Sequence, residues 1–222
     1  MVKTDWEAQA GTSLYTKMFL PFYDWSALKF NLRLIWKCPS HHMLALYNEN
    51  VSSNHLDIGP GTGYFLQRCR FPVSPPRVAL MDLNPNCLEL SATRLKQYNP
   101  ETHLHNALEP IGIDIEPFDS IAIMNLLHCL PGDMSTKAVV FNHLKPLLNP
   151  GGVLFGSTIL GTGVPQNFLA RRLQRYCNSR GYMTNYEDDF DSLQRRLEEY
   201  FPETSIRIVG CVALFSARKQ TQ

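Results

Sequence analysis

Residues 55–63 read HLDIGPGTG, and this stretch decides the fold of the 222-residue chain. Its first half is a short apolar run typical of a buried strand, and the glycines predict a tight turn before a helix that begins near Tyr64. Glycine tolerates positive φ angles and leaves bare backbone for a ligand to lie against. A dinucleotide-binding GxGxxG turn would need a third glycine where Tyr64 stands, and no Lys-Ser or Lys-Thr of a P-loop follows. The stretch therefore predicts a ligand-binding strand–turn–helix unit that does not hold the pyrophosphate of NAD.

A second acidic residue follows at the end of the next predicted strand. Asp82 lies near the end of the apolar run 77–83, 25 positions after Asp57 (82 − 57). A carboxylate there can accept hydrogen bonds from both hydroxyls of a ribose, whereas Asp57 can face the amino group of an amino-acid moiety. An ordinary glycine turn in an α/β protein would explain the glycines alone, but not the two acids together with the strand order.

Outside this unit the sequence alternates between strand-like and helix-like segments. Apolar runs without polar alternation, as in sheets covered on both faces, lie at 77–83, 118–125 and 153–160. Helical patterns lie at 85–98, from Asp133 or Ser135 to Leu147, at 166–179 and at 191–200. The runs 205–210 and 211–217 have almost nothing between them, so they can only form an antiparallel hairpin. We predict an α/β fold with a seven-stranded, mostly parallel, doubly wound sheet that ends in this hairpin.

The first 50 residues differ in character from the remainder. They are rich in aromatic residues and almost free of glycine. Apolar residues at helical spacing predict a helix within 26–36, and a second short helix is expected over 41–47. We divide the chain into an N-terminal helical cap or lid at 1–50 and an α/β core at 51–222. For most of the aromatic residues of the cap, the alternative is an ordinary place in the hydrophobic core.

Composition and charge narrow the class of partner. The chain has 21 Lys and Arg against 20 Asp and Glu, a net charge of +1, so it has no overall field to gather a nucleic acid. Its six cysteines form no CxxC pair, which favours free thiols in a reducing compartment over a disulfide framework. The first residues lack the apolar segment of a signal peptide, and no stretch reaches the ~18 consecutive apolar residues of a membrane span. We expect a cytoplasmic protein with no membrane span and no nucleic-acid partner.

Four segments together resemble the motifs of class I S-adenosylmethionine-dependent methyltransferases. HLDIGPGTGYF (55–65) is similar to motif I, written (D/E)xGxGxG, and ALMDLNPNCLELSATRL (79–95) is similar to motif II. FDSIAIMNLLHCLPG (118–132) resembles motif IV, and LKPLLNPGGVLFGSTIL (144–160) resembles the helix-to-strand segment after it. The resemblance covers residues 50–217. The whole chain is further similar to small methyltransferases of microbial secondary metabolism, some fungal members of which O-methylate polyketide α-pyrones.

The resemblance implies which residues bind S-adenosylmethionine. They are the motif acids and glycines with their neighbours at the strand ends: Asp57, Gly59, Gly61, Gly63, Asp82, Leu83, Asn106, Ala107 and Asn125. The family often has Asp where Asn106 stands, and an Asn can still accept from the adenine amino group through its side-chain oxygen. From the cap, Tyr15 and Tyr23 could reach the cofactor carboxylate with their hydroxyl groups.

The acceptor side follows from the chemistry of methyl transfer. Transfer from a sulfonium is a direct displacement, so the protein mainly aligns the acceptor and keeps it deprotonated. His128 follows the fourth strand at the carboxyl edge of the sheet and is the candidate catalytic base, with a structural hydrogen bond as the alternative. We expect no metal, because the positions that hold Mg²⁺ in catechol-type methyltransferases carry Asn125 and Ser157-Thr158 here.

We therefore predict an enzyme that moves a methyl group from S-adenosylmethionine to an enol or phenol hydroxyl of a small apolar acceptor, such as a polyketide. The alternative is a cyclase or pericyclase on the same scaffold, which would hold the cofactor only as a positive charge. A non-catalytic partner subunit is disfavoured because the cofactor motif is intact. N- or C-methylation and the oligomeric state stay open.

Overall fold

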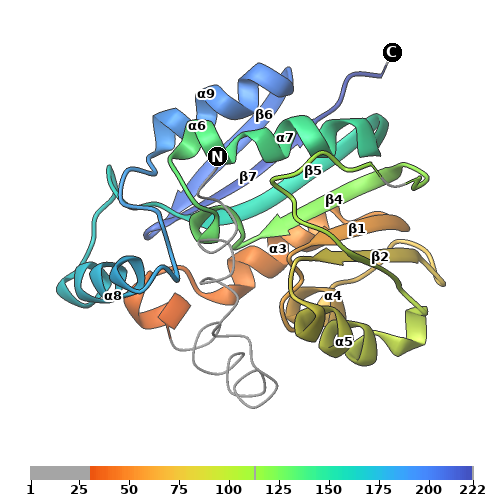
Figure 1. Cartoon of the computed structure of the whole chain (residues 1–222), viewed down its shortest axis with the longest axis horizontal. Helices are drawn as coiled ribbons and strands as arrows, with labels where there is room; N and C mark the ends of the chain where they lie inside the picture. The colour runs from red at the N-terminus through yellow and green to blue at the C-terminus, as the bar shows by residue number, and fades with distance from the viewer. Residues whose placement is uncertain (1–30, 113, 222) are drawn as a thin grey trace.

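Seven strands form one sheet in the computed structural model, which describes residues 31–112 and 114–221 (Figure 1). The strands are β1 (Asn54–Ile58), β2 (Arg77–Asp82), β3 (Glu101–Leu104), β4 (Phe118–Met124), β5 (Leu148–Ile159), β6 (Glu203–Val209) and β7 (Val212–Arg218). Their order across the sheet is β3-β2-β1-β4-β5-β7-β6. Strands β1 to β5 pair in parallel, and β7 pairs antiparallel with both β5 and β6. The predicted mostly parallel sheet with its C-terminal hairpin is confirmed.

The strand order reverses between β1 and β4. The chain builds outward from β1 through β2 to β3 and then returns to the other side of β1 with β4. Ligands of such sheets bind in the crevice at the carboxyl ends of the strands beside this reversal. The end of β1, where the glycine turn begins, lies at this point.

Helices cover both faces of the sheet (Figure 1). On one face lie α3 (Ser40–Asn50), α4 (Tyr64–Arg68) and α5 (Pro85–Arg94). On the other lie α6 (Met134–Lys137), α7 (Val139–Leu144) and α9 (Phe190–Tyr200), and α8 (Phe168–Ser179) lies at one end of the molecule. Short 3-10 turns are η2 (Lys96–Tyr98), η3 (Leu127–Cys129) and η4 (Lys145–Leu147).

Two hydrophobic clusters fill the spaces between sheet and helices. Leu56 of β1 packs in the cluster that contains Phe141 of α7 and Leu197 of α9. The opposite cluster joins Tyr47 of α3 to Phe155 of β5. Because both faces are covered, the central strands are apolar on both sides and show no alternation.

Residues 31–50, the described part of the predicted cap, pack closely on the rest of the chain. Met43 and Tyr47 of α3 are fully buried against the sheet. The Cys211 N–H donates to the carbonyl oxygen of Trp36 at 2.8 Å, and a Cβ on Gly210 would lie 2.3 Å from that oxygen. The described part of the cap is therefore joined to the second cluster and to the turn between β6 and β7. The division at residue 50 stays a prediction.

Two predicted helices are broken in the structure. The segment 85–98 is α5 followed by η2, and 133–147 is α6, α7 and η4. Pro146 lies in the first turn of η4, where its missing N–H costs nothing, and it could not have continued α7. Four helices begin at an Asn or Asp side chain that accepts a backbone N–H, at Asn84, Asp133, Asn167 and Asp189.

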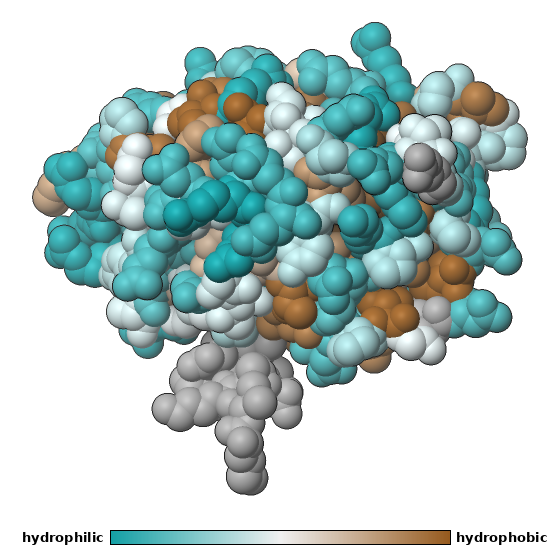
Figure 2. Space-filling model, turned by 90° about the horizontal axis from the view of Figure 1, so that it is seen from above, coloured by the Kyte–Doolittle hydropathy of each residue, from teal (hydrophilic) through white to brown (hydrophobic). Residues whose placement is uncertain are grey.

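The surface in Figure 2 is mostly hydrophilic, with separate apolar patches between polar side chains. Among the described residues, Leu104, Phe168 and Leu169 are the most exposed of the larger apolar side chains apart from Val73. Within 31–112 and 114–221, no helix combines the length and the apolar character that crossing a bilayer requires.

Candidate functional site

A cavity opens at the carboxyl ends of β1, β2, β3 and β4. Its lining comes from the residues that end these strands and from the loops after them. It holds about 1110 Å³ of empty space including its opening to solvent, enough for a ligand of nucleoside size. The cavity brings together eight predicted cofactor residues, namely Asp57, Gly59, Gly61, Asp82, Leu83, Asn106, Ala107 and Asn125. The ninth, Gly63, shapes the turn without lining it.

The glycine turn consists of left-handed backbone. Gly59, Gly61 and Gly63 have φ angles of 66°, 56° and 72°. Residues with a Cβ adopt such angles at a cost of about 1 kcal/mol or more. A Cβ on Gly59 would also lie 3.0 Å from Leu126 Cδ1, and one on Gly63 would lie 3.3 Å from Ser91 Cβ. The glycines therefore serve both the conformation of the turn and the close approach of its neighbours.

Asp57 is the penultimate residue of β1 and lies on the cavity wall in a buried position, 4% exposed. Its Oδ2 accepts a 2.8 Å hydrogen bond from the Tyr47 hydroxyl, whereas Oδ1 has no hydrogen-bond partner among the residues that the structure describes. Burial raises the pKa of Asp57 to about 7; the Tyr47 hydrogen bond opposes this rise and the nearby Asp82 carboxyl adds to it. A buried carboxyl with one unsatisfied oxygen is suited to a cationic ligand group.

Asp82 ends β2 on the same cavity. Its Oδ1 accepts the Asn84 backbone N–H at 2.8 Å. Burial raises the pKa of Asp82 to about 6, and backbone N–H groups of Asn84, Gly61 and Leu83 oppose this rise. Leu83 lines the cavity with a side chain that is 37% exposed, an apolar surface that suits a flat ring.

Asn106 and Ala107 follow β3 and also line the cavity. The Asn106 Oδ1 accepts the Leu108 backbone N–H at 3.1 Å, and its Nδ2 donates to Glu109 Oε1 at 3.2 Å. The side chain therefore holds its own turn, and Oδ1 keeps a second lone pair for a ligand. Its role toward adenine stays a prediction.

Asn125 follows β4 in a left-handed conformation with a φ of 55°. Its backbone N–H donates to the Ser157 carbonyl oxygen at 2.9 Å, and the Ser157 hydroxyl donates to Asn125 Oδ1 at 3.0 Å. Non-glycine residues held at such angles cluster at functional sites. The hydrogen bonds to β5 hold this conformation at the cavity wall.

His128 is buried, 4% exposed, and is not part of the cavity lining. Its Nδ1 accepts the Ile159 backbone N–H at 3.2 Å, so the neutral ring carries its proton on Nε2. Burial, and to a smaller extent the charge of Lys137, lowers the pKa of His128 to about 3. With Nδ1 engaged and Nε2 protonated, this arrangement weighs against a general base. The catalytic role of His128 stays a prediction.

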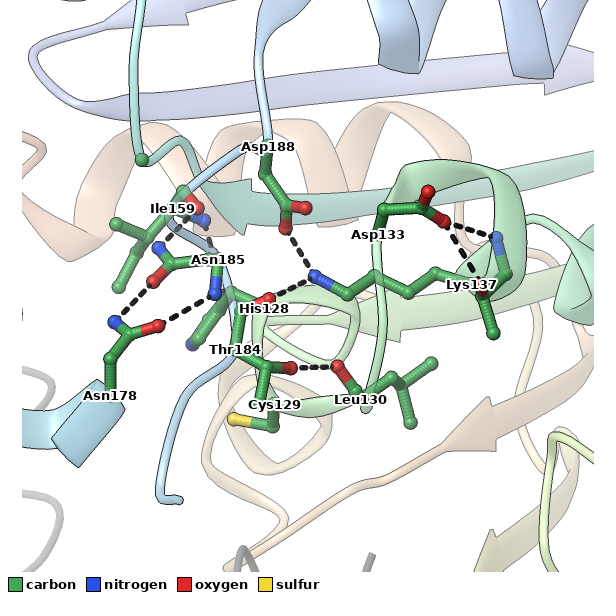
Figure 3. Close-up of polar contacts among 12 residues, drawn as sticks. His128, Cys129, Leu130, Asp133, Lys137, Ile159, Asn178, Thr184, Asn185 and Asp188 are labelled. Atoms are coloured by element: carbon green, nitrogen blue, oxygen red, sulfur yellow. Dashed lines mark hydrogen bonds and ion pairs between the residues drawn. The ribbon is translucent and has the colours of Figure 1, made fainter. Parts of the chain in front are cut away.

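The segment between α8 and α9 ties the His128 turn to α6 (Figure 3). The Thr184 N–H donates to the His128 carbonyl oxygen at 3.0 Å, and its hydroxyl donates to the Leu130 carbonyl oxygen. Lys137 Nζ donates to the Thr184 carbonyl oxygen at 2.7 Å and to Asp188 Oδ2 at 2.6 Å. The Lys137 and Asp188 side chains are 0% and 1% exposed. This buried ion pair therefore supports the stretch of cavity wall at Leu130.

Two predicted residues, Tyr15 and Tyr23, lie outside the described residues. Within the described ranges, no three His, Cys, Asp or Glu side chains are grouped to hold a metal ion. Sequence reasoning missed Tyr47, which contacts Asp57, and Cys129 and Leu130, which line the cavity. The position after the fourth strand could have identified the last two, whereas the role of Tyr47 depends on how α3 packs.

Comparisons with known proteins identify the family of the chain. A family model described as a methyltransferase domain matches residues 56–154. Demethylluteothin O-methyltransferase of Streptomyces thioluteus is 39% identical over 211 residues, which cover 95% of this chain and 90% of the relative. The physcion biosynthesis cluster O-methyltransferase of Aspergillus chevalieri is 36% identical over 95% of this chain and 96% of its own.

Among solved structures, the N-methyltransferase NodS from Bradyrhizobium japonicum WM9 in complex with S-adenosyl-L-homocysteine superposes with a TM-score of 0.58. The match covers 91% of this chain and 97% of NodS at 18% sequence identity. At that identity the similarity concerns the fold.

Proposed function

The chain belongs to the S-adenosylmethionine-dependent methyltransferases, and from this premise we propose that it methylates a hydroxyl group of a small, largely apolar acceptor. The observation that carries the proposal is the cavity at the strand ends, where the unpartnered Oδ1 of Asp57 lies beside the glycine turn. The relatives named as O-methyltransferases cover nearly the whole chain and favour oxygen as the acceptor atom. They also favour methyl transfer over the cyclase alternative.

The residues around the cavity fit S-adenosylmethionine. Asp57 Oδ1 would accept a hydrogen bond from the ammonium group, and Asp82 would accept from the ribose hydroxyls. Leu83 and Ala107 offer apolar contact for adenine. When bound, the cofactor supplies an electrophilic methyl group on a sulfonium.

The contribution of the chain to the reaction is alignment and the exclusion of water. An apolar cavity wall at the end of β4 and in the turn after it consists of Met124, Leu126, Cys129 and Leu130. An enolic hydroxyl is acidic enough to react without a strong base, which is consistent with the engaged Nδ1 of His128. We therefore favour an enol or an acidic phenol, as found in polyketides, as the acceptor.

The class of partner and the cellular location of the enzyme are also proposals. The net charge of +1 supports a small-molecule acceptor rather than a nucleic acid. Six free cysteines support a reducing compartment, and we propose a cytoplasmic location.

A methyl-transfer assay tests the proposed function. The protein is incubated with S-adenosylmethionine and a panel of phenols and enolic pyrones, and the products are analysed by mass spectrometry. We expect a product that is heavier by one methylene group and an equal amount of S-adenosylhomocysteine, both absent with Asp57→Ala. Conversion of an acceptor without release of S-adenosylhomocysteine would contradict the proposal in favour of the cyclase.

The role of His128 is tested separately. If its ring acts on the acceptor, His128→Ala lowers kcat and leaves the Kd for S-adenosylmethionine unchanged. Unchanged turnover, or loss of cofactor binding, would remove His128 from the reaction and leave it the structural hydrogen bond to Ile159.

A further inference from the structure

Asp57 is the last member of a buried chain of hydrogen bonds that crosses three elements. The Tyr47 hydroxyl of α3 lies 2.8 Å from Asp57 Oδ2 and 2.8 Å from His55 Nε2 of β1. The His55 Nδ1 lies 2.7 Å from Ser120 Oγ of β4, and this oxygen accepts the Ser52 backbone N–H at 2.9 Å. Tyr47, His55 and Ser120 are 0% exposed. The strand register, which pairs His55 with Ser120, holds the chain together.

The donor and the acceptor of each hydrogen bond can be assigned by starting from the Asp57 carboxylate, which only accepts. The Tyr47 hydroxyl donates to the Asp57 carboxylate, so its oxygen accepts from His55 Nε2–H. A neutral imidazole has one ring proton, which leaves Nδ1 to accept from the Ser120 hydroxyl. Burial lowers the pKa of His55 to about 3, so the ring is neutral throughout the physiological range. All donors in the chain point toward Asp57.

We propose that Tyr47 is a positioning residue of the cofactor site, which holds the Asp57 carboxyl with Oδ1 free for an ammonium group and sets the pH range of cofactor binding. This inference rests on the proposed function. The Tyr47 hydroxyl donates its hydrogen bond to one carboxylate oxygen of Asp57, Oδ2. The other oxygen, Oδ1, has no hydrogen-bond partner among the described residues, and Asp57 itself lines the cavity. A ligand ammonium would satisfy it.

The pH dependence follows from the groups that face Asp57. They are Tyr47 from α3, Cys69 after α4, and Asp82 from β2. Burial raises the pKa of the Cys69 thiol to about 12 and that of the Tyr47 hydroxyl well above its usual value, so neither titrates near neutral pH. The carboxyls remain, with a pKa of about 7 for Asp57 and about 6 for Asp82.

An ammonium ligand needs the ionised form of Asp57. The affinity for the ligand should therefore decrease at pH values below about 7. Well below this pH, the loss should approach tenfold for each further pH unit. The Tyr47 hydrogen bond lowers the pKa of Asp57, so a variant without this donor should lose affinity at a higher pH. The loss of one hydrogen bond to a carboxylate corresponds to a shift of about one pH unit.

The test measures the Kd of S-adenosylhomocysteine, which keeps the amino group, by calorimetric titration from pH 5.5 to pH 9. The variants are Tyr47→Phe and, as a matched control, Tyr200→Phe, whose hydroxyl lies on α9 on the opposite face of the sheet. We expect the wild type and Tyr200→Phe to share one profile. For Tyr47→Phe we expect the profile to move up by about one pH unit, with affinity about fivefold weaker at pH 7, about tenfold weaker near pH 5.5 and similar at pH 9.

Two results would overturn the inference. A Tyr47→Phe profile that coincides with the wild type would show that Tyr47 does not act on Asp57. Weaker binding by one constant factor at every pH would show a structural role only. If the folded wild type does not bind at any pH, the proposed function itself fails, which is a distinct outcome.

A measurement without ligand supports the same conclusion. The carboxyl carbon of Asp57 can be titrated by NMR in the free protein, where Tyr47→Phe should raise the midpoint. If Tyr47→Phe does not fold, Ser120→Ala interrupts the chain at a more distant link and should raise the midpoint by a smaller amount. An unchanged midpoint in the variant measured would contradict the proposal.

Discussion

Replacement of Asp57 by Asn should stabilise the free protein at pH 8 while it removes cofactor binding. Burial raises the pKa of Asp57 from 3.8 to about 7, so the folded state holds an ionised carboxyl at a cost above pH 7. A gap of about 3 pH units at about 1.4 kcal/mol each gives about 4 kcal/mol as an upper value. Because the effective dielectric constant of a protein is higher than that of a dry interior, we expect about half of this, a gain of about 2 kcal/mol. Asn has the same shape and can still accept from Tyr47.

The sign of the pH dependence follows from the raised pKa. The folded protein binds a proton on Asp57 between about pH 4 and pH 7 that the unfolded chain has released. The contribution of this group to stability is therefore greatest below about pH 4, declines as the pH rises to about 7, and is constant above it. Asp57→Asn lacks this decline. The difference in unfolding free energy between the two proteins should grow from pH 4 to pH 7 and then level off.

Urea unfolding of both proteins at pH 5, 6, 7 and 8 without cofactor measures this difference. In thermal unfolding, a gain of about 2 kcal/mol corresponds to a Tm that is higher by about 4–8 °C for a chain of this length. Titration with S-adenosylhomocysteine at pH 8 should show no binding to Asp57→Asn. Equal or lower stability of the variant at pH 8 would refute the argument from burial, and unchanged affinity would refute the role of Asp57 toward the ammonium.

Three further substitutions test separate parts of the account. Asp188→Ala leaves the Lys137 ammonium group buried without its ionic partner and should lower the free energy of unfolding by about 3–5 kcal/mol in urea. The control Glu199→Ala, at the exposed ion pair with Arg196, should leave stability unchanged, and equal effects of the two variants would contradict the role of the buried pair. Gly161→Ala places a Cβ 1.6 Å from a backbone carbonyl oxygen and should lower the Tm strongly, whereas Gly112→Ala, with nothing within 4 Å, should not; the reverse order would show that the backbone yields there. Asp82→Ala should weaken S-adenosylmethionine binding by about 1–3 kcal/mol in calorimetry, and unchanged affinity would remove it from the ribose site.

The sheet could be predicted from the sequence because burial on both faces determines which residue types its strands contain. Strands covered on both faces are uniformly apolar, and the run from 205 to 217 is too short for anything but a hairpin. The breaks in the helices at 85–98 and 133–147 are harder to recognise in the sequence. Apolar spacing reports which face is buried, and it does not report where a 3-10 turn replaces an α-helical one.

The residues of the site likewise comprise some that the sequence predicts and some that it does not. Asp57, the glycines and Asp82 were predicted because a tight turn at a strand end restricts which residue types can stand there. In the sequence Tyr47 is one aromatic residue of the cap among many, since its contact with Asp57 depends on how α3 crosses the sheet. His55 likewise read as part of an apolar strand, although its ring joins Tyr47 to Ser120.

The central claim is that the cavity at the ends of β1, β2, β3 and β4 binds S-adenosylmethionine, and calorimetric titration of the full chain at pH 8 tests it most directly. We predict one-to-one binding of S-adenosylmethionine and of S-adenosylhomocysteine, lost in Asp57→Ala. The absence of binding of either compound to a protein shown to be folded would contradict the account.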